Sequence, residues 1–177
     1  KKKHDRIRFD CGIVALNNYL KLMANQQSKK DNARTFVLED EANPERIIGY
    51  YTLSIAPINI EALPIKLKKK HQNASSGGLI ARLAVDKHYH KKGYGEWLLV
   101  DALKKLLVAS EIVAFPIVVV DAKEGAVGFY EKFDFIAEAK LVGVSLRQCL
   151  GKLNALFVAA VNVRHHASMG NAEDSKR

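Results

Sequence analysis

The middle of the chain limits the possible folds more than any other part. Residues 79–85 form a largely apolar run with branched side chains, which predicts a buried strand. Gly93 and Gly95 follow, and apolar residues then recur at helical spacing to about Ala109. Residues 115–120 are again apolar and β-branched, and predict the next strand. A strand, a helix and a strand in this order predict two parallel strands joined by a right-handed crossover.

The residues before this unit predict a helix and a hairpin. A helix is expected from about residue 12 to 27, because apolar side chains recur there at three- and four-residue spacing: Ile13, Leu16, Leu20 and Met23. Residues 35–38 and 47–55 are β-branched and aromatic, and the turn signal Asn43 and Pro44 separates them. They predict an antiparallel hairpin. The polar, lysine-rich residues 66–78 predict a long exposed loop.

The residues after the central unit complete the expected sheet. Residues 124–132 predict a short helix, the chain after Phe135 predicts a strand to about Val142, and residues 156–161 predict a closing strand. We therefore expect an α/β (α+β) fold, with a mixed central β-sheet and helices on both faces. The predicted organisation is one domain over residues 1–163 and a polar C-terminal tail over residues 164–177. Because the sequence begins at Lys1 rather than Met, we expect a few natural residues before it.

The composition of the chain limits which cellular compartment and which classes of ligand are expected. The chain has 28 Lys and Arg residues against 19 acidic ones, a net charge of +9, which favours nucleic acid or a phosphorylated cofactor over cationic ligands. A merely solvated basic surface is the alternative. Cys11 and Cys149 form neither a disulfide framework nor a zinc spacing, and the adjacent His165 and His166 lack a third ligand, so no metal is expected. No apolar run approaches about 20 residues. These features predict a soluble, cytoplasmic protein that does not bind membranes.

The glycines at the start of the central helix predict a phosphate site. Backbone N–H groups in the first turn of a helix have no intrahelical acceptors, and the helix dipole favours an anion there. Gly93 and Gly95 remove side chains that would block a close approach. Leu98 stands where a dinucleotide fingerprint has its third glycine, so this motif is different. Lys91 and Lys92 could add charge to a bound phosphate, but exposed, solvated lysines are an equally good interpretation.

Several motifs together resemble the shared core of GNAT acetyltransferases, and more narrowly the GNAT toxins of bacterial type II toxin–antitoxin systems. The resemblance runs from about Phe9 to Phe135. The family core is carried by residues 82–86, by the glycine loop, by Leu98, Leu99, Ala102 and Leu103, and by Asp121, Ala122, Ala126, Phe129, Tyr130, Phe133 and Phe135. The toxin group is carried by Phe9, Cys11 and Gly12, by residues 33–37 and by residues 49–53. His90 departs from the usual Arg or Gln, Asp134 departs from the usual Gly, and residues 141–151 fit poorly.

The resemblance implies the GNAT fold and acetyl-CoA as co-substrate. It places the cofactor on the backbone of a bulged, splayed strand and on the glycine loop, which here are Leu83, Ala84, Val85, His90, Lys91, Lys92, Gly93, Tyr94 and Gly95. It also points the Tyr130 hydroxyl at the thioester sulfur as a proton donor. A buried tyrosine that satisfies a backbone carbonyl is the alternative. Glu96, Asp86 and Asp121 are candidate bases, but an aminoacyl ester has an unusually acidic ammonium group and needs none.

The resemblance further implies an acceptor and partners. The acceptor is the α-amino group of an aminoacyl-tRNA, whose acetylation inhibits translation in the bacterial cytoplasm. Basic side chains that could contact the tRNA, besides Lys91 and Lys92, are Arg34, Lys66, Lys68, Lys69, Lys70 and Arg82. A homodimer and a ribbon-helix-helix antitoxin are also implied. Two alternatives stay open: a GNAT enzyme acting on a protein N-terminus, a lysine or a small amine, and a catalytically silent module that binds CoA or RNA.

Overall fold

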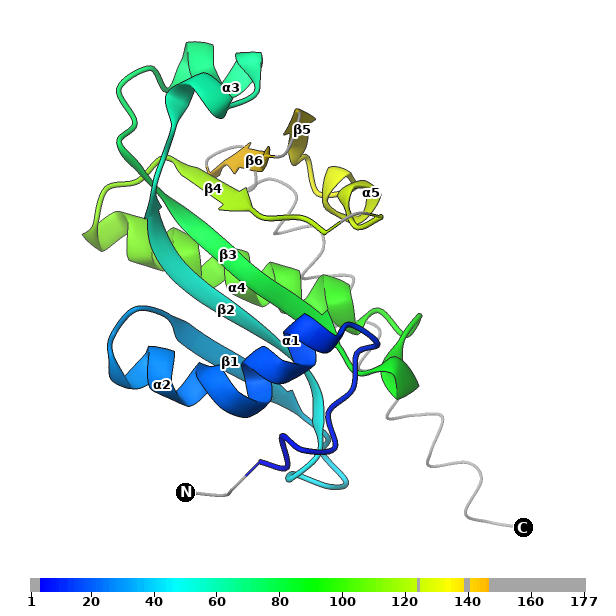
Figure 1. The fold of residues 1–177 in the computed structure, drawn as a ribbon. Helices are drawn as coiled ribbons and strands as arrows, with labels where there is room; N and C mark the ends of the chain where they lie inside the picture. Colours follow the sequence, from blue (N-terminus) through cyan, green and yellow to red (C-terminus); the bar gives the residue numbers. More distant parts are fainter. Residues whose placement is uncertain (1–3, 124, 139–140, 147–177) are drawn as a thin grey trace.

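A mixed six-stranded sheet, in the order β1-β2-β3-β4-β6-β5, forms the centre of the molecule (Figure 1). The computed structural model describes residues 4–123, 125–138 and 141–146. Among the strands of these residues, only β3 and β4 pair in parallel, from Gly78 opposite Val118 to Ile80 opposite Val120. The strands are β1 (Arg34–Glu39), β2 (Ile47–Pro57), β3 (Ser76–Val85), β4 (Ile117–Val120), β5 (Ile136–Glu138) and β6 (Leu141–Ser145). The predicted fold class is confirmed.

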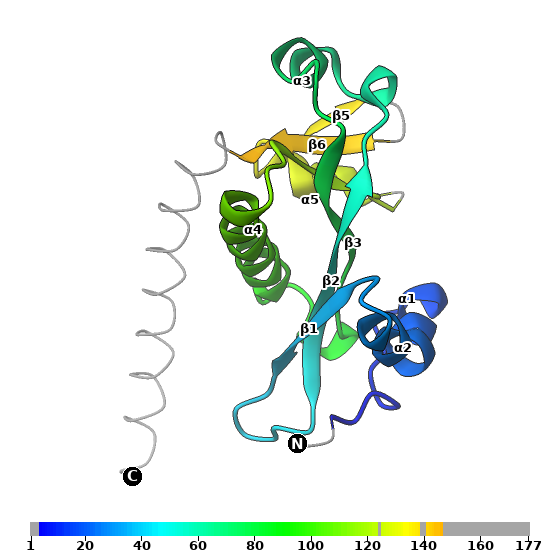
Figure 2. The same ribbon diagram turned by 90° about the vertical axis from the view of Figure 1, so that its left-hand side faces the viewer.

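Helices cover both faces of the sheet, as Figure 2 shows for α4 on one face and α1 and α2 on the other. The helices are α1 (Val14–Asn18), α2 (Ala24–Lys29), α3 (Ile65–Lys70), α4 (Tyr94–Ile112) and α5 (Val127–Glu131), with a π-helix at Tyr19–Met23 and 3-10 turns at Ile60–Ala62 and Lys87–Tyr89. Successive side chains of β2 point to opposite faces. The Tyr50 hydroxyl donates to Leu16 O in α1, whereas the Tyr51 hydroxyl donates to Asp101 in α4. Both faces of β2 are therefore buried from Ile47 to Leu53.

The prediction of a long exposed loop over residues 66–78 is wrong. Residues 65–70 form α3, and β3 begins at Ser76. Leu67 is the buried residue of α3 and belongs to one core cluster with Ile117 and with Leu63, which precedes the helix. The side chains of Lys66, Lys69 and Lys70 are exposed. A Cβ at Gly78 would lie 2.8 Å from the ring of Phe115, so this glycine serves close packing within a strand rather than a turn.

Other predicted elements changed in detail. The first helix is interrupted by the π-helical turn, and the chain after Phe135 contains β5 and β6 rather than one strand. β6 lies between β4 and β5, with Val144 opposite Val118. The poorly matching residues 141–151 thus contribute a central strand in their described part.

The predictions for residues 156–161 and 164–177, and the boundary at 163, lie outside the described residues. No helix in the described ranges has the length and apolarity to cross a membrane.

Candidate active site

β3 separates from β4 before it ends. Thr52 pairs with Arg82 but Leu53 pairs with Ile80, so Ala81 is an extra residue that bulges the strand. Pairing with β4 stops at Ile80. Beyond this point Leu83, Ala84 and Val85 still pair with β2 on one edge, and among the described residues no strand pairs with their other edge. That free edge can accept an extended ligand as an added strand.

The loop after β3 turns sharply into α4. Gly93 caps this helix with φ +80°, and Lys91 also has a left-handed φ of +61°. A Cβ built on Gly93 would meet no atom within 4 Å, so the space above the loop is open. The N–H groups of Tyr94 and Gly95 open a 19-residue helix and have no intrahelical acceptors. Open space, free amide groups and the helix dipole together suit a phosphate.

The structure brings three distant motifs together beside this loop. A Cβ at Gly95 would lie 3.6 Å from Cε2 of Phe129 and 3.9 Å from Cγ2 of Val85. The end of β3, the first turn of α4 and helix α5 therefore meet at one point. The Phe129 ring packs edge-on against Tyr130, with the ring centroids 5.1 Å apart. Phe129 therefore contacts the glycine loop, a role that the sequence analysis did not predict, because it used Phe129 only as part of the family motif.

Tyr130 is buried between aromatic rings. Its side chain is 6% exposed and its ring centroid lies 5.5 Å from that of Phe135. Desolvation by burial raises the pKa of Tyr130 to about 12. Within the described part of the chain, its hydroxyl makes no hydrogen bond that would lower this pKa. The phenol is therefore protonated near pH 7, and no backbone carbonyl among the described residues occupies it.

The structure gives each departure from the family motifs a local role. His90 Nε2 lies 2.8 Å from Val85 O, and because a carbonyl oxygen only accepts, the imidazole donates. His90 thus ties the loop back to the end of β3. Asp134 has φ +64°, a left-handed conformation that explains a glycine preference here and that Asp tolerates better than most residues.

Asp86 is a structural carboxylate rather than a free base. Its fully buried side chain accepts hydrogen bonds from Asp10 N at 3.1 Å and from His88 N at 3.0 Å, and lies 3.8 Å from an Arg46 nitrogen. Burial opposes the charge, but these hydrogen bonds outweigh it and lower the pKa of Asp86. The carboxylate joins the N-terminal segment to the turn that precedes the glycine loop. Glu96 and Asp121 are exposed and stay candidate bases.

Replacing Asp86 by Ala should destabilise the fold by about 2–5 kcal/mol near pH 7, because two backbone N–H groups lose their acceptor. A lowered folded-state pKa stabilises the protein above the unfolded value and loses that effect as the pH falls through the folded value. The stability gap between wild type and variant should therefore narrow below about pH 4. Urea unfolding at several pH values measures it, with Asp86→Asn as the control that keeps an acceptor oxygen. A gap that does not change with pH would contradict a charged Asp86.

Other nucleophiles and metal sites gain no support. Cys11 is buried, its thiol lies 3.1 Å from Asn17 Oδ1, and burial raises the pKa of that thiol, which makes it inert. Cys149, His165 and His166 lie outside the described residues. Among the residues that are described, no group of three or more His, Cys, Asp or Glu side chains could hold a metal ion.

The predicted substrate-contacting cations do not share one surface. Arg34 pairs with Asp31, Lys68 pairs with Glu61, and the Arg82 guanidinium lies 3.7 Å from the centroid of the Tyr19 ring. The exposed side chains of Lys66, Lys69 and Lys70 make no ion pair with any residue that the structure describes. These lysines are on α3, which leads into the start of β3, whereas Lys91 and Lys92 follow its end (Figure 1).

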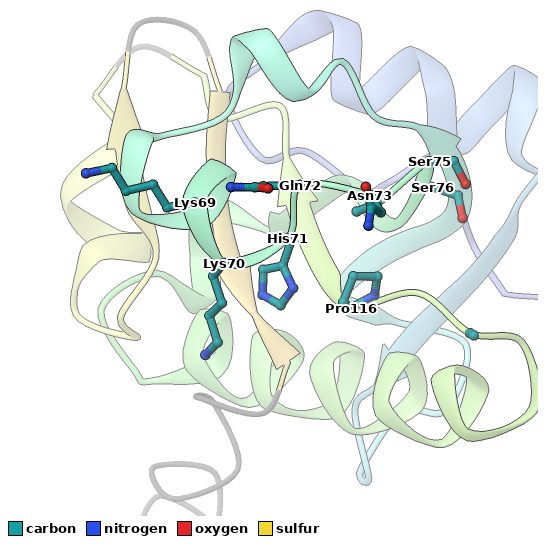
Figure 3. A pocket seen from close by; sticks show the side chains of 10 residues that line it. Lys69, Lys70, His71, Gln72, Asn73, Ser75, Ser76 and Pro116 are labelled. Atoms are coloured by element: carbon teal, nitrogen blue, oxygen red, sulfur yellow. The ribbon is translucent and has the colours of Figure 1, made fainter.

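A pocket of about 470 Å³ lies beside α3 rather than at the glycine loop (Figure 3). It opens between the end of α3, the start of β3 and Pro116 before β4. The ten residues of β3 separate it from Val85 by roughly 30 Å at the rise of an extended strand. The pocket and the meeting point of Val85, Gly95 and Phe129 are therefore separate features.

Comparisons with known proteins agree with this geometry. Residues 31–137 match the family model described as the acetyltransferase (GNAT) domain. The chain is 30% identical over 121 residues to the probable toxin TacT of Sinorhizobium fredii, covering 67% of this chain and 66%, just under two thirds, of the relative. The structure of AtaT complexed with acetyl-methionyl-tRNAfMet has a TM-score of 0.74 and 27% identity, and covers 89% of this chain and 94% of that one. A Tyr→Phe mutant of AtaT, bound to the C-terminus of the antitoxin AtaR and to acetyl-CoA, has a TM-score of 0.71 and 26% identity, over 89% and 92% of the two chains.

Proposed function

The chain belongs to the GNAT acetyltransferase family, and we propose that it transfers the acetyl group of acetyl-CoA to the α-amino group of an aminoacyl-tRNA. The observation that carries this proposal is the meeting of Val85, Gly95 and Phe129, which joins the cofactor strand, the phosphate loop and the helix of Tyr130. The related toxin AtaT, solved with acetyl-methionyl-tRNAfMet, supports the choice of acceptor. Acetylation of this acceptor would inhibit translation.

The residues around the splayed strand fit acetyl-CoA, which supplies the acetyl group as an activated thioester. The edge of Leu83, Ala84 and Val85 that no described strand covers would pair with the amide groups of its extended arm, through the backbone groups other than Val85 O, which His90 already contacts. The loop of residues 90–95 and the first N–H groups of α4 would hold the pyrophosphate, where the space above Gly93 is open. Lys91 and Lys92 belong to this loop, are exposed and would add positive charge near the pyrophosphate.

Tyr130 would supply the proton that the departing thiolate needs. Its hydroxyl is protonated across the neutral range, because its pKa is about 12. Complete transfer to a thiolate is uphill for such a weak acid, since thiols have a pKa near 8.5. Tyr130 therefore donates a hydrogen bond as negative charge grows on sulfur. Tyr130 would then transfer its proton to the sulfur while it takes up a proton from the acceptor nitrogen. That nitrogen must lose a proton as it becomes an amide.

The acceptor amine must be neutral to attack the thioester carbonyl. Asp86 is engaged by the hydrogen bonds of the turn and is poorly suited to take its proton. An α-amino group beside an ester is an unusually weak base, so a substantial neutral fraction exists near pH 7. This acidity favours an aminoacyl ester over a lysine or a polyamine, which would need a dedicated base.

The proposed partners follow from the same comparison. We infer that the chain binds an antitoxin, because a related AtaT variant was solved with the C-terminus of AtaR. A ribbon-helix-helix antitoxin, a homodimer and a place in the bacterial cytoplasm are parts of this proposal. Light scattering of the purified protein, alone and with the antitoxin, measures both assemblies.

A comparison of possible acceptors tests the proposed one. The protein is incubated with labelled acetyl-CoA and, in separate reactions, with bulk charged tRNA, uncharged tRNA, ribosomal protein and spermidine. We expect label in charged tRNA that is released when the aminoacyl ester is hydrolysed. Label in ribosomal protein or spermidine alone would replace the proposal with a protein- or amine-acetylating enzyme. Binding of acetyl-CoA without any labelled product would indicate a silent binding module.

Salt should weaken the interaction with tRNA, because polyanion binding releases counterions. If Lys66, Lys69 and Lys70 each contact a phosphate, affinity should fall roughly 10- to 50-fold between about 50 and 200 mM salt. The dissociation constant for uncharged tRNA and kcat/KM for charged tRNA measure this, and acetyl-CoA affinity serves as the control. Acetylation of charged tRNA that is insensitive to salt would contradict phosphate contacts.

A further inference from the structure

The pocket beside α3 is lined by cationic and hydrogen-bonding side chains. Its lining includes Lys69, Lys70, His71, Asn73, Ser75 and Ser76, and none of its ten lining residues is acidic. Figure 3 shows His71 and Asn73 at the turn that joins α3 to β3, with the side chains of Lys69 and Lys70 extending outward from it. A hollow with hydrogen-bond donors, positive charge and no carboxylate favours an anion.

The positive charge at the pocket is uncompensated by the residues that the structure describes. Lys68, the preceding residue on α3, pairs with Glu61. Lys69 and Lys70 line the pocket and make no such pair with a described residue. The α3 lysines are therefore not equivalent: the charge of Lys68 is balanced locally, whereas those of Lys69 and Lys70 are available to a ligand.

The base of the pocket is anchored to the sheet. His71 Nε2 lies 3.2 Å from Oγ of Ser145, a residue of β6 that is 1% exposed. Burial and the neighbouring Lys70 lower the pKa of His71, so its imidazole is neutral near pH 7. The Ala74 N–H donates to His71 O at 3.0 Å and closes the turn. The lysines are thus the source of positive charge, and the turn that follows them is held to the sheet by His71.

We propose that this pocket binds a backbone phosphate of the RNA acceptor, as a contact separate from the acetyl-transfer site. This proposal rests on the proposed function. A phosphate of acetyl-CoA held at the glycine loop does not explain the pocket, because the two lie at opposite ends of β3, roughly 30 Å apart. An RNA substrate is long enough to reach both regions. The pocket therefore adds affinity for RNA without taking part in the chemistry.

The test removes the two lysines and compares them with a matched pair. K69Q/K70Q is the variant, and K29Q/K30Q is the control: Lys29 and Lys30 also end a short helix, α2, and make no ion pair with a described residue. We expect K69Q/K70Q to reduce the salt slope of uncharged-tRNA binding by about 1, because the pocket holds one phosphate. Its KM for charged tRNA should rise several-fold, while acetyl-CoA affinity and acetylation of an RNA-free aminoacyl ester stay unchanged.

Three outcomes would overturn the proposal. Normal tRNA binding by K69Q/K70Q would show that the pocket takes no phosphate of RNA. An equal loss in K29Q/K30Q would show a general effect of net charge. Inorganic phosphate binding that K69Q/K70Q abolishes, with tRNA binding unchanged, would assign the pocket to a free anion. Failure of the proposed function looks different, because the wild-type protein would then leave charged tRNA unlabelled.

Discussion

Tyr130→Phe should slow acetyl transfer by roughly 100- to 10,000-fold, the usual contribution of a positioned general acid. The substitution removes one oxygen and keeps the ring that packs against Phe129 and Phe135. The hydroxyl makes no hydrogen bond with a described residue, so thermal stability and acetyl-CoA affinity should change little. Single-turnover rates at saturating acetyl-CoA, measured beside thermal melts, separate chemistry from folding. Near-normal transfer by this variant would exclude Tyr130 as the proton donor.

Tyr50→Phe is the matched control for a structural tyrosine. The fully buried Tyr50 hydroxyl donates to Leu16 O at 2.8 Å, so its loss removes one of the hydrogen bonds that this carbonyl accepts, while the N–H of Tyr19 still donates to it. This variant should lose about 0.5–1.5 kcal/mol of stability, the contribution of one hydrogen bond, and its folded fraction should still turn over. The two variants are thus expected to show opposite patterns. The pH profile tests the raised pKa of Tyr130. It would be contradicted if the wild-type rate fell with rising pH already well below about 11, and if Tyr130→Phe abolished that pH dependence.

Gly93→Val should weaken acetyl-CoA binding by roughly 10- to 100-fold, the effect of losing about 1.5–3 kcal/mol of charge-assisted hydrogen bonds. Its left-handed φ of +80° disfavours a β-branched residue, and the new side chain would fill the open space above the loop. Calorimetry measures the dissociation constant. The loop lies at the surface, so the variant should still fold.

Gly12→Val separates backbone strain from phosphate binding. Gly12 has φ +84° and no atom within 4 Å of a built Cβ, which matches Gly93 in both respects, but it precedes α1 rather than α4. Both variants should lose similar stability, about 1–2 kcal/mol. Only Gly93→Val should lose acetyl-CoA affinity. Equal affinities in the two variants would show that the loop does not hold the pyrophosphate.

Local sequence patterns were sufficient for most of the secondary structure. The alternating or continuous apolar runs predicted β1 to β4, because strand burial leaves a direct mark on the residues of the strand itself. The glycines at 93 and 95 predicted the turn into α4, since a left-handed cap at the surface needs a glycine. Helix α3 was missed. Leu67 is the buried residue of this helix and Leu63 precedes it, with a proline, an isoleucine and a lysine between the two leucines. Only contact with β4 shows that both are core residues.

The sequence by itself determined the order of the elements apart from α3 and the division of the last strands into β5 and β6, the basic character of the chain and the motifs of a GNAT acetyltransferase. Only the tertiary structure decided that the Ala81 bulge frees the edge of β3, and that Val85, Gly95 and Phe129 meet. It also decided that Arg34 and Lys68 are paired while Lys69 and Lys70 line a pocket. The reason is physical: propensity and periodicity act between near neighbours in the chain, whereas ion pairs, strand separation and cavities depend on contacts between residues far apart in sequence.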